Sequence, residues 1–230
     1  MEHPFLFLVD LLDAEGSLYH FAHSYPQVVY TWFIMGLLIV LGLLATKSIN
    51  MVPGKLQNLF ELVVDGIENF MVDTIGEEGR WLFPIAASIF IFVFIGNLIG
   101  LVPGFYPPTA TLNTTAALAL VVFVMTHVIG VKYHGANYYK HFIGPVWWMV
   151  PLILPIEIIG HLARVLSLSF RLFGNMMGHE LVLGILFMLA GLFFAPLPIM
   201  ALGIFVSFVQ AFVFFLLTII YFSGAMEHAH

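Results

Sequence analysis

The stretch Leu166–Leu181 reads LSLSFRLFGNMMGHEL and lies inside an apolar run, residues 155–221, that is far longer than one bilayer crossing. The best turn in this run is Gly191–Pro198, which contains two prolines. The run therefore predicts a helical hairpin, with arms at about 155–192 and 196–223.

The first arm of this hairpin is too long for a simple crossing. As one helix it would extend for about 57 Å, nearly twice a hydrocarbon thickness of about 30 Å. Its internal breakers are single glycines, which transmembrane helices tolerate, so we expect one strongly tilted helix. A break at Gly174–Asn175 is the alternative.

The composition extends this membrane character to the whole chain. Of 230 residues, 61% are hydrophobic and 9% are charged, whereas soluble domains carry about 25% charged residues. Three more charge-free runs, at about 28–46, 82–102 and 114–131, each have the length of one crossing. We expect a single membrane domain over residues 1–230, with an N-terminal tail at 1–27.

The segment between the first two spans has a different pattern. Its apolar residues recur at helical spacing: Leu56, Leu59, Phe60, Val63, Ile67, Phe70 and Met71. Pro53 suits a first turn and Gly76 a stop, so we expect an amphipathic helix at about 53–72 on the membrane surface. The predicted fold is all-α, with five transmembrane helices and this surface helix.

Charge and residue content exclude several functions. A net charge of −6 leaves no basic surface for a nucleic acid. The chain has no cysteine, which excludes thiolate metal sites and cysteine nucleophiles. We expect no cofactor, no bound metal and no enzymatic activity of the chain on its own.

The basic residues outside the hairpin predict the orientation. Lys47, Lys55 and Arg80 lie between the first two spans, and Lys132 and Lys140 follow the third. With five crossings all of them are on one side, which the positive-inside rule makes cytoplasmic. The N-terminus is then outside and the C-terminus inside the cell.

The hairpin carries many polar residues: Glu157, His161, Arg164, Ser167, Ser169, Arg171, Asn175, His179, Glu180, Ser207 and Gln210. A charged side chain at mid-bilayer costs about 2.5–3.5 kcal/mol on insertion scales, so these groups are expected to face an interior, a water path or a partner. At about 100° per residue, Glu157 and Asn175 share a face with Arg171, whereas Glu180 lies about 180° away. The spacing therefore predicts two polar environments.

Antiparallel packing of the two arms predicts which residues meet. With the turn near residue 191, Gln210 stands opposite Arg171, and Gly203 stands opposite His179. Gly203 would leave room for the imidazole. Arg171 and Gln210 would then lie at the same depth in the membrane on neighbouring helices.

Structural interpretations of these residues remain open. Arg164 is compatible either with snorkelling to the interface or with a channel role. Ser207 and Gln210 are compatible with simple helix–helix hydrogen bonds, and we interpret His127 in that way.

Other functional classes compete. A haem- or quinone-binding subunit of a respiratory redox complex would use His127, His161 and His179 as candidate ligands. An HExxH metalloprotease is excluded, because Leu183 stands where the second histidine is required. A self-contained transporter predicts internal repeats, and the sequence shows none.

The run LSLSFRLFGNMMGHEL, with GNLIGLVPG at 96–104 and the C-terminal FVQAFVFFLLTIIYFSGAMEH, resembles subunit a of the F-type ATP synthases. The resemblance covers essentially the whole chain. It implies the stator half of a proton path, in which two offset half-channels lead to a rotating ring of c subunits. The implied partners are the c-ring, b-type peripheral stalk subunits, through them the F1 sector, and the lipid of a bacterial cytoplasmic (inner) membrane.

The resemblance also implies roles for individual residues. Arg171 is similar to the essential arginine that faces the ring carboxylate, and Asn175 and Gln210 to its polar helpers. His179 and Glu180 resemble periplasmic-side channel groups. Glu157 resembles the acidic residue of the cytoplasmic exit path. Four further residues are similar to residues that line the channel: Arg164, His161, Ser207 and Asn97. Many bacterial relatives have a small residue at position 179 and a histidine at 203, so the pair is exchanged here.

Overall fold

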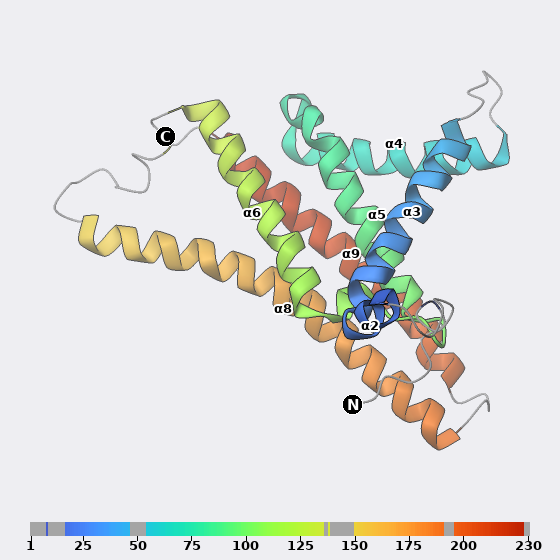
Figure 1. Cartoon of the computed structure of the whole chain (residues 1–230). Coiled ribbons are helices and arrows are strands. Elements are labelled where there is room, and N and C mark those ends of the chain that lie inside the picture. Colours follow the sequence, from blue (N-terminus) through green and yellow to red (C-terminus); the bar gives the residue numbers. More distant parts are fainter. Residues whose placement is uncertain are drawn as a thin grey trace.

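The computed structural model describes residue 8, residues 17–46, 54–135, 138, 150–190 and 196–227. All regular secondary structure in these residues is helical (Figure 1). The α-helices are α2 (Ser17–Ser24), α3 (Pro26–Thr46), α4 (Lys55–Ile75), α5 (Phe83–Ile99), α6 (Leu112–His134), α8 (Val150–Ala190) and α9 (Pro196–Met226). Two 3₁₀ turns, η1 (Glu77–Leu82) and η2 (Pro108–Ala110), precede α5 and α6.

Five segments in the described residues are long and apolar enough to cross a membrane. They are α3, η1 with α5, α6, α8 and α9. The prediction of an all-α membrane protein with five spans is confirmed.

The long arm of the hairpin is one helix of 41 residues. Its length is about 60 Å, and Gly174–Asn175 lies within it without a break. α8 extends from Val150, five residues before the predicted limit of about 155, and includes Pro155. A proline in the second turn removes one backbone hydrogen bond near the end of a helix, which transmembrane helices tolerate. Figure 1 shows α8 running obliquely past α6.

Glycines and prolines end the other helices close to the predicted limits. α4 stops at Gly76, whose φ of +86° is strained for any side chain but open to glycine. The helix therefore runs three residues beyond the predicted end at 72. α5 ends at Ile99, three residues before the predicted limit of 102, because the chain then turns toward Pro107 and Pro108.

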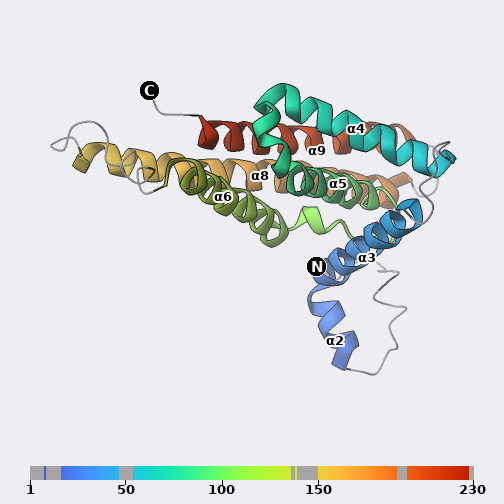
Figure 2. The same cartoon turned by 90° about the horizontal axis from the view of Figure 1, so that it is seen from above.

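Aromatic packing holds the surface helix on the bundle. Phe70 of α4 lies 5.2 Å from Phe212 of α9, and Phe90 of α5 lies 5.7 Å from Phe215 of α9, between ring centroids. These rings belong to a buried core that α4, α5, α6, α8 and α9 share. Figure 2 shows α8 and α9 running side by side, with α4 against α9.

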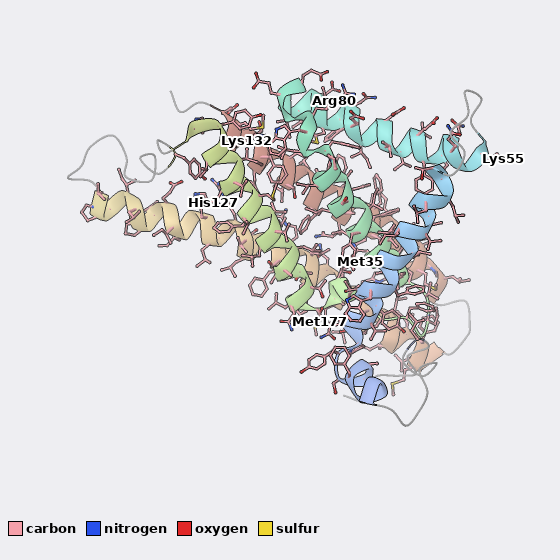
Figure 3. All side chains as sticks on the ribbon, turned by 45° about the horizontal axis from the view of Figure 1, so that its top comes forward. Met35, Lys55, Arg80, His127, Lys132 and Met177 are labelled. Atoms are coloured by element: carbon pink, nitrogen blue, oxygen red, sulfur yellow. The ribbon has the colours of Figure 1, made fainter. Side chains whose placement is uncertain are left out.

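One end of the bundle carries the described basic residues outside the hairpin. The Nζ atom of Lys132, near the end of α6, lies 3.5 Å from the ring centroid of Trp81 in η1. Trp81 Nε1 donates a 3.3 Å hydrogen bond to Tyr133 Oη. The start of the second span and the end of the third therefore lie at the same level, and Figure 3 places Lys55 and Arg80 along the same edge. Lys47 and Lys140 lie outside the described residues.

Candidate functional site

Arg171 lies at the middle of α8, 21 positions after Val150 and 19 before Ala190. Its side chain is exposed on the surface of the helix. No hydrogen bond or ion pair joins this side chain to any other part of the chain that the structure describes. A guanidinium at the centre of an apolar helix is therefore left without a counter-ion among the described residues.

Small residues surround Arg171 on the same face. Gly160, Gly174 and Gly178 lie within about 60° of it around the helix. A Cβ atom added at any of the three would meet nothing within 4 Å. Another helix could approach this face closely, as small residues permit in membranes.

Three amide side chains form hydrogen bonds between the helices near this level. Asn175 Nδ2 donates a 2.7 Å hydrogen bond to Gln210 Oε1, which joins α8 to α9. Asn97 Nδ2, on α5, donates a 3.4 Å bond to the Ser207 carbonyl. Asn97, Ser207 and Gln210 are buried, whereas Asn175 is exposed. The partner of Gln210 is thus one turn along α8 from Arg171.

His179 and Gly203 meet across the hairpin, as the predicted register requires. A Cβ atom at Gly203 would overlap the His179 imidazole and a methyl group of Leu101. The imidazole Nε2 lies 3.3 Å from the carbonyl oxygen of Ile199 on the same arm as Gly203. The absence of a side chain at 203 therefore creates the space that the imidazole occupies.

Glu180 belongs to a different environment from Arg171. Because α8 is one unbroken helix, its carboxyl group points about 180° away from Arg171. It lies near Tyr106, in the loop before η2. Burial and, second, the nearby Glu180 carboxylate raise the pKa of Tyr106 to about 12.

The second polar group lies toward the start of α8. Glu157 Oε1 and His161 Nε2 are 3.3 Å apart, one turn from each other. Arg164, one turn further along, places its guanidinium carbon 5.5 Å from the centroid of the Tyr221 ring on α9. The predicted residues thus fall into two groups, with Arg171 between them along α8.

Three residues near these groups were not predicted as site residues. The first is Thr109, whose hydroxyl is buried without a hydrogen-bond partner among the described residues; the side-chain oxygen Oδ1 of Asn97, a predicted residue, is buried in the same way. Buried polar atoms of this kind usually bind water. Tyr106 lies beside Glu180, and the His127 ring lies 5.0 Å from that of His161. Thr109 lies in the three-residue turn η2 and Tyr106 in the loop before it, and neither segment is long enough for periodicity to carry a signal.

The described part of the chain contains no cluster of side chains suited to hold a metal ion. There, no three histidine or carboxylate side chains lie close enough together to hold an ion.

These features are those of a class of proteins, the integral membrane subunits for ion translocation: two polar groups along one long apolar helix flank a cation that has no counter-ion among the described residues. The family model described as ATP synthase A chain matches residues 28–223. The chain is 68% identical to ATP synthase subunit a of Desulfosudis oleivorans over 230 residues, which is all of both chains. It is 56% identical to the proteins of the same name from Syntrophobacter fumaroxidans and Trichlorobacter lovleyi, again over both full lengths. The chain belongs to the ATP synthase A chain family.

Proposed function

We propose that Arg171 is the stationary cation at which this chain hands protons to and from a moving carboxylate. As a member of its family, the chain is the stator proton-channel subunit of an F-type ATP synthase. The observation that carries the assignment of Arg171 is its position at the midpoint of α8 without a partner in the described chain. A charge in that place needs a counter-ion from another polypeptide.

The geometry indicates what that polypeptide presents. Arg171 stands on a face lined by Gly160, Gly174 and Gly178, which suits close contact with a second transmembrane helix. The matching group is a carboxylate at mid-membrane depth. We infer that the partner is the ring of c subunits, and that b-type stalk subunits connect the chain to the F1 sector.

A fixed guanidinium suits this task chemically. It stays protonated at any working pH, so it cannot itself pass a proton between two paths. It does stabilise an ionised carboxylate in an apolar medium. Each proton that crosses about 100 mV releases about 2.3 kcal/mol, which biases ring rotation when the only route runs through the ring.

The two polar groups are assigned to two half-channels. Glu180, with His179, Asn97, Ser207, Gln210 and Asn175 nearby, would form the periplasmic side. Glu157, His161 and Arg164 would form the cytoplasmic side. Along α8, Glu180 and Glu157 are nine and 14 positions from Arg171, about 13 Å and about 21 Å. A direct leak from one group to the other would have to pass the guanidinium.

The remaining assignments concern the setting. The chain contributes no catalytic residue of its own and serves as a non-catalytic part of the complex. We infer a bacterial inner membrane, with the edge that carries Lys55, Arg80 and Lys132 facing the cytoplasm. The N-terminus would then lie outside. The redox-subunit alternative is not favoured, because the matched relatives are named ATP synthase subunit a.

The test is Arg171→Ala in the assembled complex. We expect loss of ATP-driven proton pumping while the complex still assembles, because the ring carboxylate loses its cation. Proton uptake into inverted vesicles, normalised to the amount of assembled complex, is the measurement. Arg80→Ala is the matched control, since its charge pairs with Glu68 and Glu77 at the helix ends. Pumping at the wild-type rate by assembled Arg171→Ala complex would refute the assignment.

A further inference from the structure

Two histidines from different helices meet on the cytoplasmic side of Arg171. The His127 ring of α6 and the His161 ring of α8 lie 5.0 Å apart between centroids, with their planes tilted by 54°. At this separation the ring edges are in contact or one water molecule apart. Both side chains are half-buried. Figure 3 shows His127 on the part of α6 toward the edge that carries Lys132.

The hydrogen bonds of the pair orient the two imidazoles differently. His127 Nδ1 lies 2.9 Å from the Phe123 carbonyl, which only accepts, so this nitrogen carries hydrogen and Nε2 is the nitrogen that gains or loses a proton. Nε2 of His161 lies 3.3 Å from Oε1 of Glu157. Nδ1 is the second nitrogen of the His161 imidazole that can exchange a proton. Glu157, His161 and His127 form a series of three titratable side chains that passes from α8 to α6.

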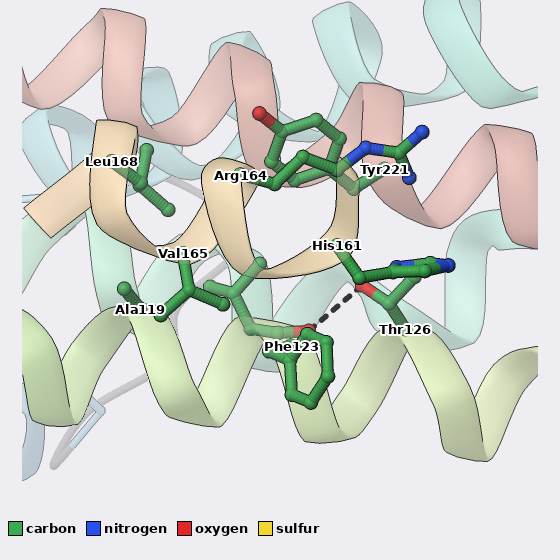
Figure 4. A pocket seen from close by; sticks show the side chains of 9 residues that line it. Ala119, Phe123, Thr126, His161, Arg164, Val165, Leu168 and Tyr221 are labelled. Carbon is green, nitrogen blue, oxygen red and sulfur yellow. Dashed lines mark hydrogen bonds between the residues drawn. The ribbon is translucent and has the colours of Figure 1, made fainter. Parts of the chain in front are cut away.

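A small cavity of about 20 Å³ adjoins this series (Figure 4). That volume has room for one water molecule. Its lining combines apolar side chains with His161, Arg164, Tyr221 and Thr126. The Thr126 hydroxyl is engaged with the Val122 carbonyl at 2.8 Å, so it does not compete for the histidines.

Resting on the proposed function, we propose that His127 is a proton-relay residue of the cytoplasmic half-channel, which exchanges protons with Glu157 through His161. The half-channel then does not stay on α8. It crosses to α6 and continues along that helix toward its end at His134. Tyr138, whose ring lies 5.9 Å from that of His127, stands next on this route.

Each transfer along the relay conserves the number of protons. His127 takes up a proton at Nε2 and releases the same proton, because the hydrogen on Nδ1 stays on that nitrogen and is donated to the Phe123 carbonyl. His161 receives this proton at Nδ1 and gives its Nε2 hydrogen to the Glu157 carboxylate, so one proton enters and one leaves. Rotation of the imidazole restores the starting tautomer, and the reverse sequence carries protons toward the cytoplasm.

The charged and titratable groups that face the relay belong to three elements. Glu157 and Arg164 come from α8, Tyr221 comes from α9, and Tyr138 follows α6. The Arg164 guanidinium lies over the Tyr221 ring and carries a permanent charge. It cannot accept a proton, which leaves the two histidines and Glu157 as the groups able to transfer one.

The experiment measures passive proton conduction by vesicles from which F1 has been removed, per assembled complex. His127→Asn keeps an amide donor toward the Phe123 carbonyl but cannot carry a proton, and we expect conduction to fall at least about fivefold. His127→Ala should lose as much and recover part of it with added imidazole. Thr218→Val is the matched control, since it removes a buried hydroxyl that bonds only to the carbonyl four residues earlier in α9 and does not line the cavity, and it should conduct within about twofold of wild type.

The outcomes separate this relay from the function on which it rests. Conduction by His127→Asn within twofold of wild type, with Arg171→Ala inactive in pumping, would overturn the relay and leave the proposed function intact. A loss in His127→Ala that imidazole does not restore would show a structural role and would also overturn the relay. Normal pumping by Arg171→Ala would overturn the function itself. Recovery with imidazole supports the relay, because a packing defect does not respond to a proton carrier.

Discussion

Gly203→Ala tests the contact between the two arms of the hairpin. The added methyl carbon would stand 2.5 Å from Cε1 of His179 and from Cδ2 of Leu101, where ordinary contacts are 3.4–4 Å. The Leu101 methyl is the end of a flexible side chain and can move. The imidazole is a rigid ring that also faces the Ile199 carbonyl, so it must leave that position.

The cost follows from this overlap. Overpacking of a tight contact costs about 1–3 kcal/mol, and loss of the hydrogen bond to Ile199 adds about 1 kcal/mol. A destabilisation of about 2–4 kcal/mol should reduce the yield of assembled complex and lower its thermal denaturation midpoint. Gly224→Ala is the matched control in α9, since its added methyl meets nothing within 4 Å.

A double-mutant cycle assigns the effect to the imidazole. His179→Ala removes the ring, so Gly203→Ala should then cost at least 1 kcal/mol less than in the wild-type background. The assay is thermal denaturation of the complex in detergent, with proton flux recorded in parallel. If Gly203→Ala matched Gly224→Ala in both measurements, the imidazole would not occupy the space beside Gly203, and the reasoning on register would fail.

Two further predictions concern the group that we propose for the periplasmic side. Glu180→Gln should slow proton flux in inverted vesicles by about tenfold or more while leaving thermal stability nearly unchanged, because the amide keeps the shape but cannot exchange a proton. Unchanged flux would count against a channel role for Glu180. Gln210→Leu should weaken the packing of α8 on α9 by about 0.6–1.7 kcal/mol, because Asn175 loses its acceptor. Adding Asn175→Leu to that variant should cost little more, and full additivity of the two losses would contradict the hydrogen bond.

Several features of the site could be predicted because they depend on the chain's own periodicity. The depth of Arg171, the opposite placement of Glu180 and the meeting of His179 with Gly203 all follow from counting along helices with a known rise and turn. Insertion in a membrane requires every backbone group to bond internally, which leaves helices as the only spans available to this apolar chain.

The start of α8 shows what the apolar pattern alone left open. Two prolines fit a first helical turn, Pro151 and Pro155, and it is Pro151 that stands in the first described turn of α8. Pro155 lies inside the helix, where the apolar medium favours continued internal hydrogen bonding over an end with exposed backbone.

By itself, the sequence determined the membrane class, the five spans and the order of polar groups along α8, since hydropathy and helical periodicity are local properties. Only the tertiary structure decided which side chains meet between helices that no short turn joins. His127 beside His161 and Tyr106 beside Glu180 depend on the rotation and crossing of separate helices. Those quantities are set by packing among many side chains at once, and no spacing within one segment contains them.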